Sequence, residues 1–393
     1  MKFLLIPLIA AATFLENGPF VVEADKAVSR GGELELSGHV KIHTGVLSAE
    51  SEEARCSHDQ KGPMNLRQKV FLSAQDYGQI SCDEATLDPS NKKALFQSKT
   101  SPVIFQDSKN GVTVESSLMT LLFTDSSIEQ FRAEKNVFAS WKYGLSCFAE
   151  EAFFVPSQNE LSFNKAHIIV KERADLHAKK ASFKTKGHAI YLEEVNGYFK
   201  AKEDLYVVSD SLSYQEPIVC LQGHVRLQVK LLSGPATLSH IDSCTIDDAK
   251  GSILVIPASG QRLLLEAPYG TMRANTIEIF YDKDDDEYRP KFFLLKGNVE
   301  MANTYSFRDP ETPVNRFALA DIVEVDCYDR VMTLKARETK RVLFFDEEKK
   351  VQVSAEAIAV CYKDGQEEIS GKGAVRMLFT ESELLRMTDR FHK

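Results

Sequence analysis

The chain has 393 residues, of which 43% are hydrophobic and 27% are charged. This composition is typical of a folded protein and excludes a generally disordered one. The net charge of −9 does not favour nucleic-acid binding. The length accommodates two or three domains, or one extended array of repeats. Segments rich in Val, Phe, Tyr, Ser and Thr recur between short turns, and this pattern favours strands.

Residues 1–15 are predicted to form a signal peptide. Lys2 supplies a positive charge, an apolar stretch follows, and Ala10, Ala11 and Ala12 offer small residues for cleavage. The alternative is a buried first strand. The apolar stretch is shorter than the roughly 20 residues that a transmembrane helix needs. The mature protein is therefore expected to be exported, and either soluble or peripheral to a membrane.

A strand pattern with glycine followed two residues later by valine recurs along the chain. It is found at residues 34–42, 221–229, 293–301 and 369–377, and more weakly at 131–139. In each strong copy apolar residues or glycine alternate with mostly polar residues, which is typical of a half-buried strand. The recurring glycine predicts a bend, a bulge or a close backbone approach at a fixed place in each strand.

A second element alternates with these strands. It consists of an apolar residue, a small residue and an acidic residue, as at 47–50, 80–84, 318–321 and 353–356. Repetition on this scale indicates stacked units that cannot bury their apolar faces alone. The sequence therefore predicts an all-β fold, an elongated antiparallel repeat of jelly-roll or taco-like stacked strands.

The sequence predicts two repeat regions and a C-terminal helix, without a sharp boundary between the two regions. One repeat region is expected at residues 20–232 and a second at 233–379, divided near Gly234. Residues 380–393 are expected to form a short C-terminal helix, because Thr380 and Glu383 make a capping box before an apolar run. This helix would cover the last open strand.

Motifs for catalysis, cofactors and metals were not found in the sequence. No phosphate-binding loop or nucleophile elbow is present, so an enzyme and a cofactor are not expected. The nine histidines lack metal-ligand spacing, and His39 and His224 occupy the same repeat position. The acidic run at 282–287 lacks the calcium-loop glycine and favours a solvated hairpin tip. Cys82 and Cys147 occupy positions that hold Ala in other copies, and Cys327 and Cys361 each precede a Tyr at matching places, which favours buried thiols over a disulfide framework.

A local cluster of positive charge stands out in this acidic chain. It includes Lys179, Lys180, Lys184 and Lys186. Lysines at strand edges commonly prevent aggregation, and this is the simpler interpretation. The functional alternative is an anion site for phosphates on a substrate.

The combination of these motifs resembles the OstA-like family of lipopolysaccharide-transport proteins. That family pairs an Ala-Asp element with a Gly-Asn-Val strand, and Ala320-Asp321 and Gly297-Asn298-Val299 match the two halves. The resemblance spans residues 20–379 as a pattern of short motifs. Acidic positions vary, with Glu50, Glu356 and Asn275 where the family has Asp, and residues 140–215 fit poorly.

The resemblance implies a periplasmic protein, peripheral to the inner or outer membrane, that shields lipopolysaccharide acyl chains without catalysis. Two sheets would enclose an apolar groove. The inward residues expected to line it are Leu36, Val40, Ile42, Val225, Leu227, Val299, Met301, Val375 and Met377. Open end strands would pair with OstA-like transport components or with further copies of the chain in a homo-oligomer.

Two other functions fit the same residues. A filled β-solenoid with a structural or adhesive role would need the same apolar inward faces. A carbohydrate-active β-helix enzyme would need carboxylates clustered on adjacent turns, whereas the aligned acidic residues are typical of turns.

Overall fold

The computed structural model describes the chain in fifteen ranges separated by short gaps. They are residues 21–44, 47–57, 62–74, 77–124, 126–142, 144–184, 189–200, 205–231, 234–268, 270–284, 287–303, 315–337, 340–347, 350–363 and 366–379. The predicted signal peptide at 1–15 and the predicted helix at 380–393 lie outside these ranges. In the described ranges, no helix is long and apolar enough to cross a membrane.

Strands make up nearly the whole of the described chain. The first are β1 Val21–Glu23, β2 Lys26–Arg30, β3 Glu33–Thr44, β4 Leu47–Ser57, β5 Met64–Ala74, β6 Gly78–Asp88, β7 Lys93–Gln97, β8 Val103–Asp107, β9 Val112–Ser116, β10 Leu118–Phe123, β11 Ile128–Trp141, β12 Leu145–Val155, β13 Glu160–Val170, β14 Ala174–Lys184 and β15 Ala189–Phe199. The rest are β16 Leu205–Gln215, β17 Ile218–Leu231, β18 Gly234–Asp247, β19 Ser252–Pro257, β20 Leu263–Ala267, β21 Gly270–Ala274, β22 Thr276–Asp284, β23 Glu287–Asn303, β24 Arg316–Asp326, β25 Val331–Lys335, β26 Val342–Asp346, β27 Val351–Ala355, β28 Ala357–Lys363, β29 Gln366–Lys372 and β30 Arg376–Phe379. One 3-10 turn, Pro156–Gln158, separates β12 from β13.

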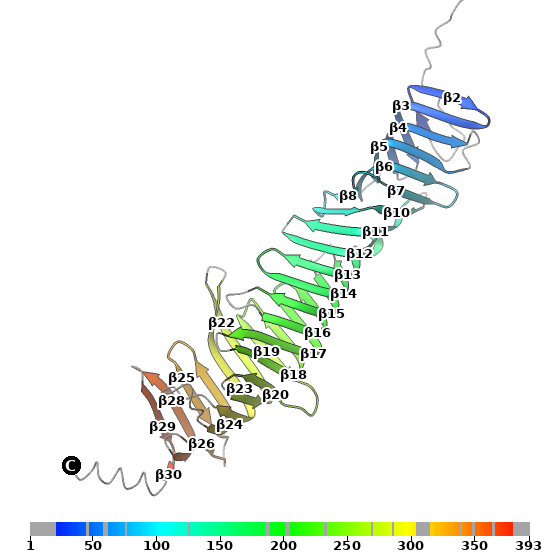
Figure 1. Cartoon of the computed structure of the whole chain (residues 1–393). Coiled ribbons are helices and arrows are strands. Elements are labelled where there is room, and N and C mark those ends of the chain that lie inside the picture. Colours follow the sequence, from blue (N-terminus) through cyan, green and yellow to red (C-terminus); the bar gives the residue numbers. More distant parts are fainter. Residues whose placement is uncertain are drawn as a thin grey trace, which may run out of the picture. The chain divides into compact units, whose positions relative to one another are not determined.

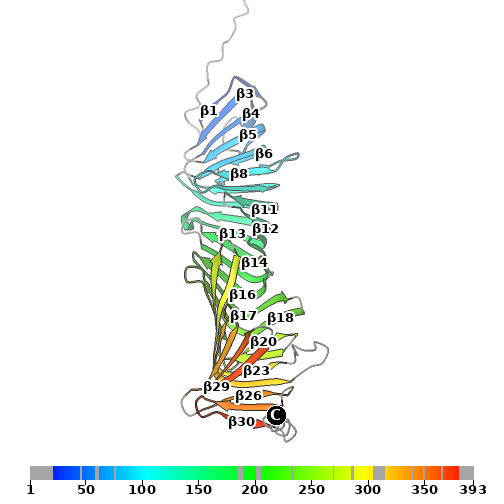
Figure 2. The same cartoon turned by 90° about the vertical axis from the view of Figure 1, so that its left-hand side faces the viewer.

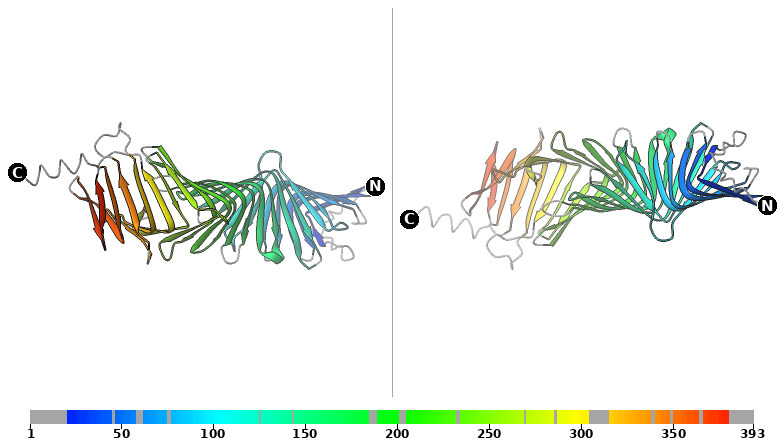
Figure 3. Two further views of the ribbon diagram at one scale, coloured as in Figure 1. Left: turned by 90° about the horizontal axis from the view of Figure 1, so that it is seen from below. Right: turned by 90° about the horizontal axis from the view of Figure 1, so that it is seen from above.

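The chain divides into two compact units, which consist mainly of residues 1–190 and residues 191–393. Within each unit the strands follow one another in chain order along the array, and a long strand followed by short ones pairs with two of them, as β6 does with β7 and β8 (Figures 1 and 2). The same order is visible in the orthogonal views, from blue to green in the first unit and from green to red in the second (Figure 3). The strand pairs described in each unit are antiparallel, so the predicted all-β antiparallel repeat is confirmed.

The recurring glycine marks a corner in the middle of a long strand. Pairing of β3 with β4 runs up to Ser37 and resumes at Val40, and β17 and β23 break register at the equivalent places. The two skipped residues have left-handed backbones: φ is +75° and +42° at Gly38 and His39, +72° and +45° at Gly223 and His224, and +80° and +46° at Gly297 and Asn298. Glycine adopts such angles at little cost, so it sets where the strand turns. The predicted bend is therefore confirmed as a two-residue bulge.

The acidic half of the repeat supports this corner. The Asp25 side chain lies against Gly38, where a Cβ atom would come within 2.6 Å of its Oδ2. The Asp25 backbone N–H donates to the Gly38 carbonyl at 2.9 Å. The Asp25 side-chain carboxylate lies 2.7 Å from Nδ1 of His39. Asp210 bonds His224 in the same way at 2.8 Å. The two sequence motifs are therefore halves of one corner.

Other corners use the carboxylate to bind backbone N–H groups. Asp83 accepts hydrogen bonds from the N–H of Lys99 at 3.1 Å and of Thr100 at 3.4 Å. Asp321 accepts from the N–H of Arg337 at 2.8 Å. These N–H donors lower the pKa of both carboxyl groups below the ordinary value, because they favour the charged form. An acidic residue at this position thus satisfies backbone groups where the ladder is interrupted.

The two histidine corners predict a pH dependence. The hydrogen bond and charge of Asp210 raise the pKa of His224 above 6.5, and Asp25 does the same for His39. A raised folded-state pKa stabilises the fold below the unfolded value near 6.5, and this contribution is lost as pH rises through the folded pKa. We expect NMR titration to place His224 above 6.5 and Asp210→Asn to lower it. An unchanged His224 pKa in that variant would contradict the pairing.

The seven cysteines are free thiols. Cys82, Cys147 and Cys244 are buried, and burial raises the pKa of each to about 12. A thiol with such a pKa is a poor nucleophile at neutral pH. These cysteines therefore act as small apolar core residues, as the repeat pattern predicted for Cys82 and Cys147.

Candidate functional site

The second unit carries two rows of partly exposed apolar side chains on the inner face of its sheet. Cross-strand pairing joins the members of each row from one strand to the next. The first row consists of Leu227, Leu238, Leu265, Met272 and Met301. The second consists of Val219, Ile246, Ile253, Ile279 and Phe293, and continues through Val325, Met332, Val360 and Ile369.

A buried row identifies the face to which these side chains belong. Leu221, Val255 and Leu295 are at most 3% exposed. Each lies two residues along its strand from a member of the second row (Val219, Ile253 and Phe293), and residues two apart on a strand share a face. The partly exposed rows therefore continue the apolar inner face toward its margins, where less of it is covered. We refer to the first row as the Leu227–Met301 row.

The first unit is filled at the equivalent place. A cross-strand row there runs through Ile42, Ala49, Leu72, Ile80, Phe105, Val114, Ala139, Cys147 and Ile168. Every member is buried, with at most 7% exposure. The cavity between Phe105, Phe131 and Leu161 measures about 10 Å³, roughly the space of one water molecule. The two units thus share a strand plan but differ in how much of the inner face remains accessible.

The residues predicted to line a groove fall into three groups. Leu36, Val40 and Ile42 belong to the filled core of the first unit, and Val225 and Val299 are buried in the second. Leu227 and Met301 lie at the two ends of the partly exposed row. Val375, just before β30, is 41% exposed, and Met377 on β30 is 45% exposed. The sequence missed Leu238, Leu265 and Met272, which lie outside the glycine motif. Contact of any of these residues with lipid stays a prediction.

Comparison with known proteins gives weak structural similarity and no match to a known sequence family. No protein-family model matches the sequence, and no curated protein sequence matches it. The chain is similar to LptH of Pseudomonas aeruginosa, described as the LptA-homologous periplasmic component of the lipopolysaccharide transport device. The similarity covers 37% of this chain and 95% of that chain, with 12% sequence identity and a TM-score of 0.28. The proposals below therefore rest on the residues of this chain.

The predicted anion site lies on β14 and beyond it. Lys179, Lys180 and Lys184 are exposed, and each takes part in an interaction with another group. Lys186 lies outside the described residues. The buried residues of β14 alternate up to Ala178 and resume at Ala181, so the alternation shifts by one residue at Lys179 and Lys180. An anion site at these lysines stays a prediction.

The acidic run likewise gives no cation site in the described part of the chain. Asp282 forms an ion pair with Lys291 at 3.4 Å and accepts a hydrogen bond from the Tyr328 hydroxyl at 3.1 Å. Asp285 and Asp286 lie outside the described residues. Asp282, the member of the run whose side chain the structure describes, thus contacts residues outside the run.

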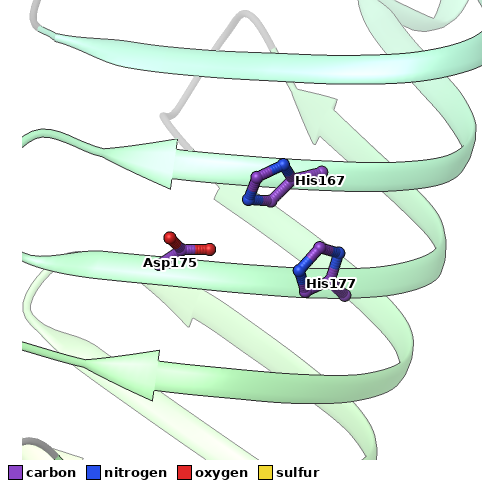
Figure 4. A group of neighbouring side chains, drawn as sticks. All are labelled: His167, Asp175 and His177. Carbon is purple, nitrogen blue, oxygen red and sulfur yellow. The ribbon is translucent and has the colours of Figure 1, made fainter.

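A group of potential metal ligands lies on β13 and β14. The ligand atoms of His167, Asp175 and His177 all lie within 4.8 Å of one another (Figure 4). The two imidazole rings are stacked, with centroids 4.2 Å apart and an interplanar angle of 13°. His167 and Asp175 are partly buried and His177 is exposed.

The sequence held a signal for this group that was missed. His167 and His177 are each five residues from Glu172, which lies in the turn between β13 and β14. In a hairpin, residues equally far from the turn face each other across the strands. Metal-ligand spacing rules count residues along one segment, so they overlook a pair of ligands related by a hairpin.

Proposed function

We propose that this protein is a lipid carrier that shields the acyl chains of a lipopolysaccharide along the inner face of its second unit. The observation that carries the proposal is the pair of partly exposed apolar rows in that unit, set beside the filled core of the first. The motif resemblance to OstA-like transport proteins supplies the lipid class. The chain would act in the periplasm, without a catalytic step and without a cofactor.

The dimensions and energetics of the rows suit an acyl chain. Neighbouring strands are about 4.8 Å apart, so the Leu227–Met301 row, which crosses five strands, is about 19 Å long. Each CH₂ group withdrawn from water contributes about 0.8 kcal/mol, so a chain of a dozen carbons exposed in water costs roughly 10 kcal/mol. Side chains without charge along the whole row let the chain slide without breaking polar contacts. Transfer would then need no chemical energy at the site itself.

Partner contacts are proposed at the ends of the strand array. Among the described residues, β1 and β2 pair with β3, β29 pairs with β28, and β30 pairs with β27. These terminal strands offer backbone groups for pairing with a strand of another chain. The proposed partners are other OstA-like transport components, or a second copy of this chain.

A charged substitution in the row tests the proposal. We expect Met272→Glu to weaken binding of fluorescent lipopolysaccharide at least tenfold, because the carboxylate would have to be covered by an acyl chain. Met272 is partly exposed, so the fold should tolerate the change. The matched control is Thr271→Glu on the same strand, which is exposed and faces the other way. Binding would be measured by fluorescence anisotropy, with circular dichroism to verify folding.

Photo-crosslinking locates the lipid independently. A diazirine amino acid at position 238 or 265 should label bound lipopolysaccharide, whereas one at position 72, in the filled first unit, should not. Equal loss of binding in Met272→Glu and Thr271→Glu, or labelling that is equal at all positions, would favour a structural or adhesive surface protein instead. No binding by the unmodified chain would reject the lipid carrier.

A further inference from the structure

We propose that His167 and His177 form a binding site for a divalent transition metal of the zinc type, with Asp175 as a third ligand. The proposal is independent of the lipid function, because it uses residues of β13 and β14 and none of the Leu227–Met301 row. Imidazole nitrogen and carboxylate oxygen together are ligands that Zn²⁺ favours, whereas Ca²⁺ and Mg²⁺ favour oxygen ligands alone.

The geometry places the ligands within reach of one ion. A tetrahedral site with bonds of 2.0–2.1 Å keeps its ligand atoms about 3.3 Å apart. The ligand atoms of the three side chains already lie within 4.8 Å of one another. Rotation about side-chain bonds is enough to close the remaining difference, because His177 is exposed and His167 only partly buried. The strands themselves need not move.

The strands hold the ligands in position. Asp175 and His177 are two residues apart on β14, so their side chains leave the same face of that strand. His167 lies on β13, and Cα pairing with Phe148 of β12 fixes its strand in register. The Phe148 and His167 rings are 6.0 Å apart, which places an apolar group on one side of the site. Side chains anchored on strands lose less freedom on binding than those on loops.

The coordination would be incomplete with protein ligands alone. Three protein ligands leave a fourth tetrahedral position for water or for an anionic group of a ligand. Lys179 lies two residues beyond His177 on the same face of β14, so its charge would oppose a cation and favour an anion at the open position. The proposed site is therefore one in which a metal and an anion bind together.

Metal titration of the full-length chain without an affinity tag tests the site. At pH 7.5 we expect isothermal titration calorimetry to give one Zn²⁺ per chain. His177→Ala and His167→Gln should each weaken binding about tenfold or more, since even losing a group that only supports a ligand costs 10–100-fold. Co²⁺ bound in the same place should give the visible absorption of a tetrahedral site, and this band should be lost in both variants.

The matched control is His224→Ala, which removes an exposed histidine that is also paired with an aspartate. It should leave Zn²⁺ affinity and the Co²⁺ spectrum unchanged. Equal affinity in the unmodified chain and in the double variant His167→Gln/His177→Ala would overturn the proposal, as would the absence of Zn²⁺ binding. Circular dichroism of each variant verifies that the strands are retained.

Discussion

Replacing Asp346 by alanine is expected to lower the free energy of unfolding of the second unit by about 3–5 kcal/mol. Asp346 has no exposed surface, and its Oδ2 lies 3.1 Å from Nε of Arg316. The two residues are paired directly across β24 and β26. Without Asp346, the buried guanidinium of Arg316 would lose the carboxylate that lies 3.1 Å from its Nε. Removing one member of a buried ion pair costs more than the pair itself contributes, because the other charge stays buried.

The measurement is urea unfolding followed by far-UV circular dichroism, with hydrogen exchange of β24 and β26 to locate the effect. The matched control is Glu324→Ala on the same strand. Glu324 forms an ion pair with Lys335 at 2.7 Å, but both side chains are partly exposed. Exposed pairs contribute 0–1 kcal/mol, so this change should be mild. A similar effect for both variants would show that burial is not what makes the Asp346 pair sensitive.

A double replacement separates the pair from its members. Arg316→Met combined with Asp346→Leu removes both charges and retains apolar volume. Buried ion pairs are often replaced in this way with little loss of stability. We therefore expect the double variant to be more stable than Asp346→Ala alone. If it is less stable, the pair itself stabilises the fold.

Replacing Phe163 by alanine is expected to destabilise the first unit by about 3–5 kcal/mol. Phe163 is 1% exposed and lies edge-on to Phe183, with ring centroids 5.5 Å apart. Trp141 lies 6.1 Å from Phe163 and 4.9 Å from Phe183. Removal of the buried Phe163 ring leaves a cavity among side chains held by strands, which cannot fully collapse.

Trp141 is the single tryptophan of the chain, so its fluorescence reports on this cluster directly. The expected result is a lower midpoint of urea unfolding and a shifted emission maximum in the native state. Phe148→Ala serves as the control, because Phe148 lies on the outer face and is 45% exposed. Surface substitutions usually change stability by about 0.5 kcal/mol or less. Equal midpoints for the two variants would indicate that the first unit is not tightly packed.

The sequence pattern predicts some of the strand corners but not all of them. The glycine copies predicted where β3, β17 and β23 turn, because a left-handed backbone is inexpensive for glycine. At Gln68 and Lys69 of β5 the same bulge forms with φ of +63° and +52° and no glycine. Pairing with the neighbouring strands imposes that corner, although Gln and Lys themselves disfavour a left-handed backbone. A pattern search for glycine therefore misses it.

For the functional site, the sequence predicted which side chains face inward but not which of them remain exposed. Alternation correctly identified Leu227 and Met301 as inward residues, and it treated Ile42 in the same way. Ile42 is 1% exposed, whereas Leu227 and Met301 are partly exposed. Alternation records which face a side chain occupies. It holds no information on what covers that face, because the covering side chains come from strands distant in sequence.

By itself the sequence determined the all-β class, the inward and outward faces of the repeat strands, and the corners marked by glycine. Each follows from the conformational preference or polarity of residues close together in the chain. The tertiary structure alone decided which apolar row stays accessible, which buried charge faces Arg316, and that His167 lies beside His177. These depend on contacts between residues on different strands, and on the register that fixes which residues meet.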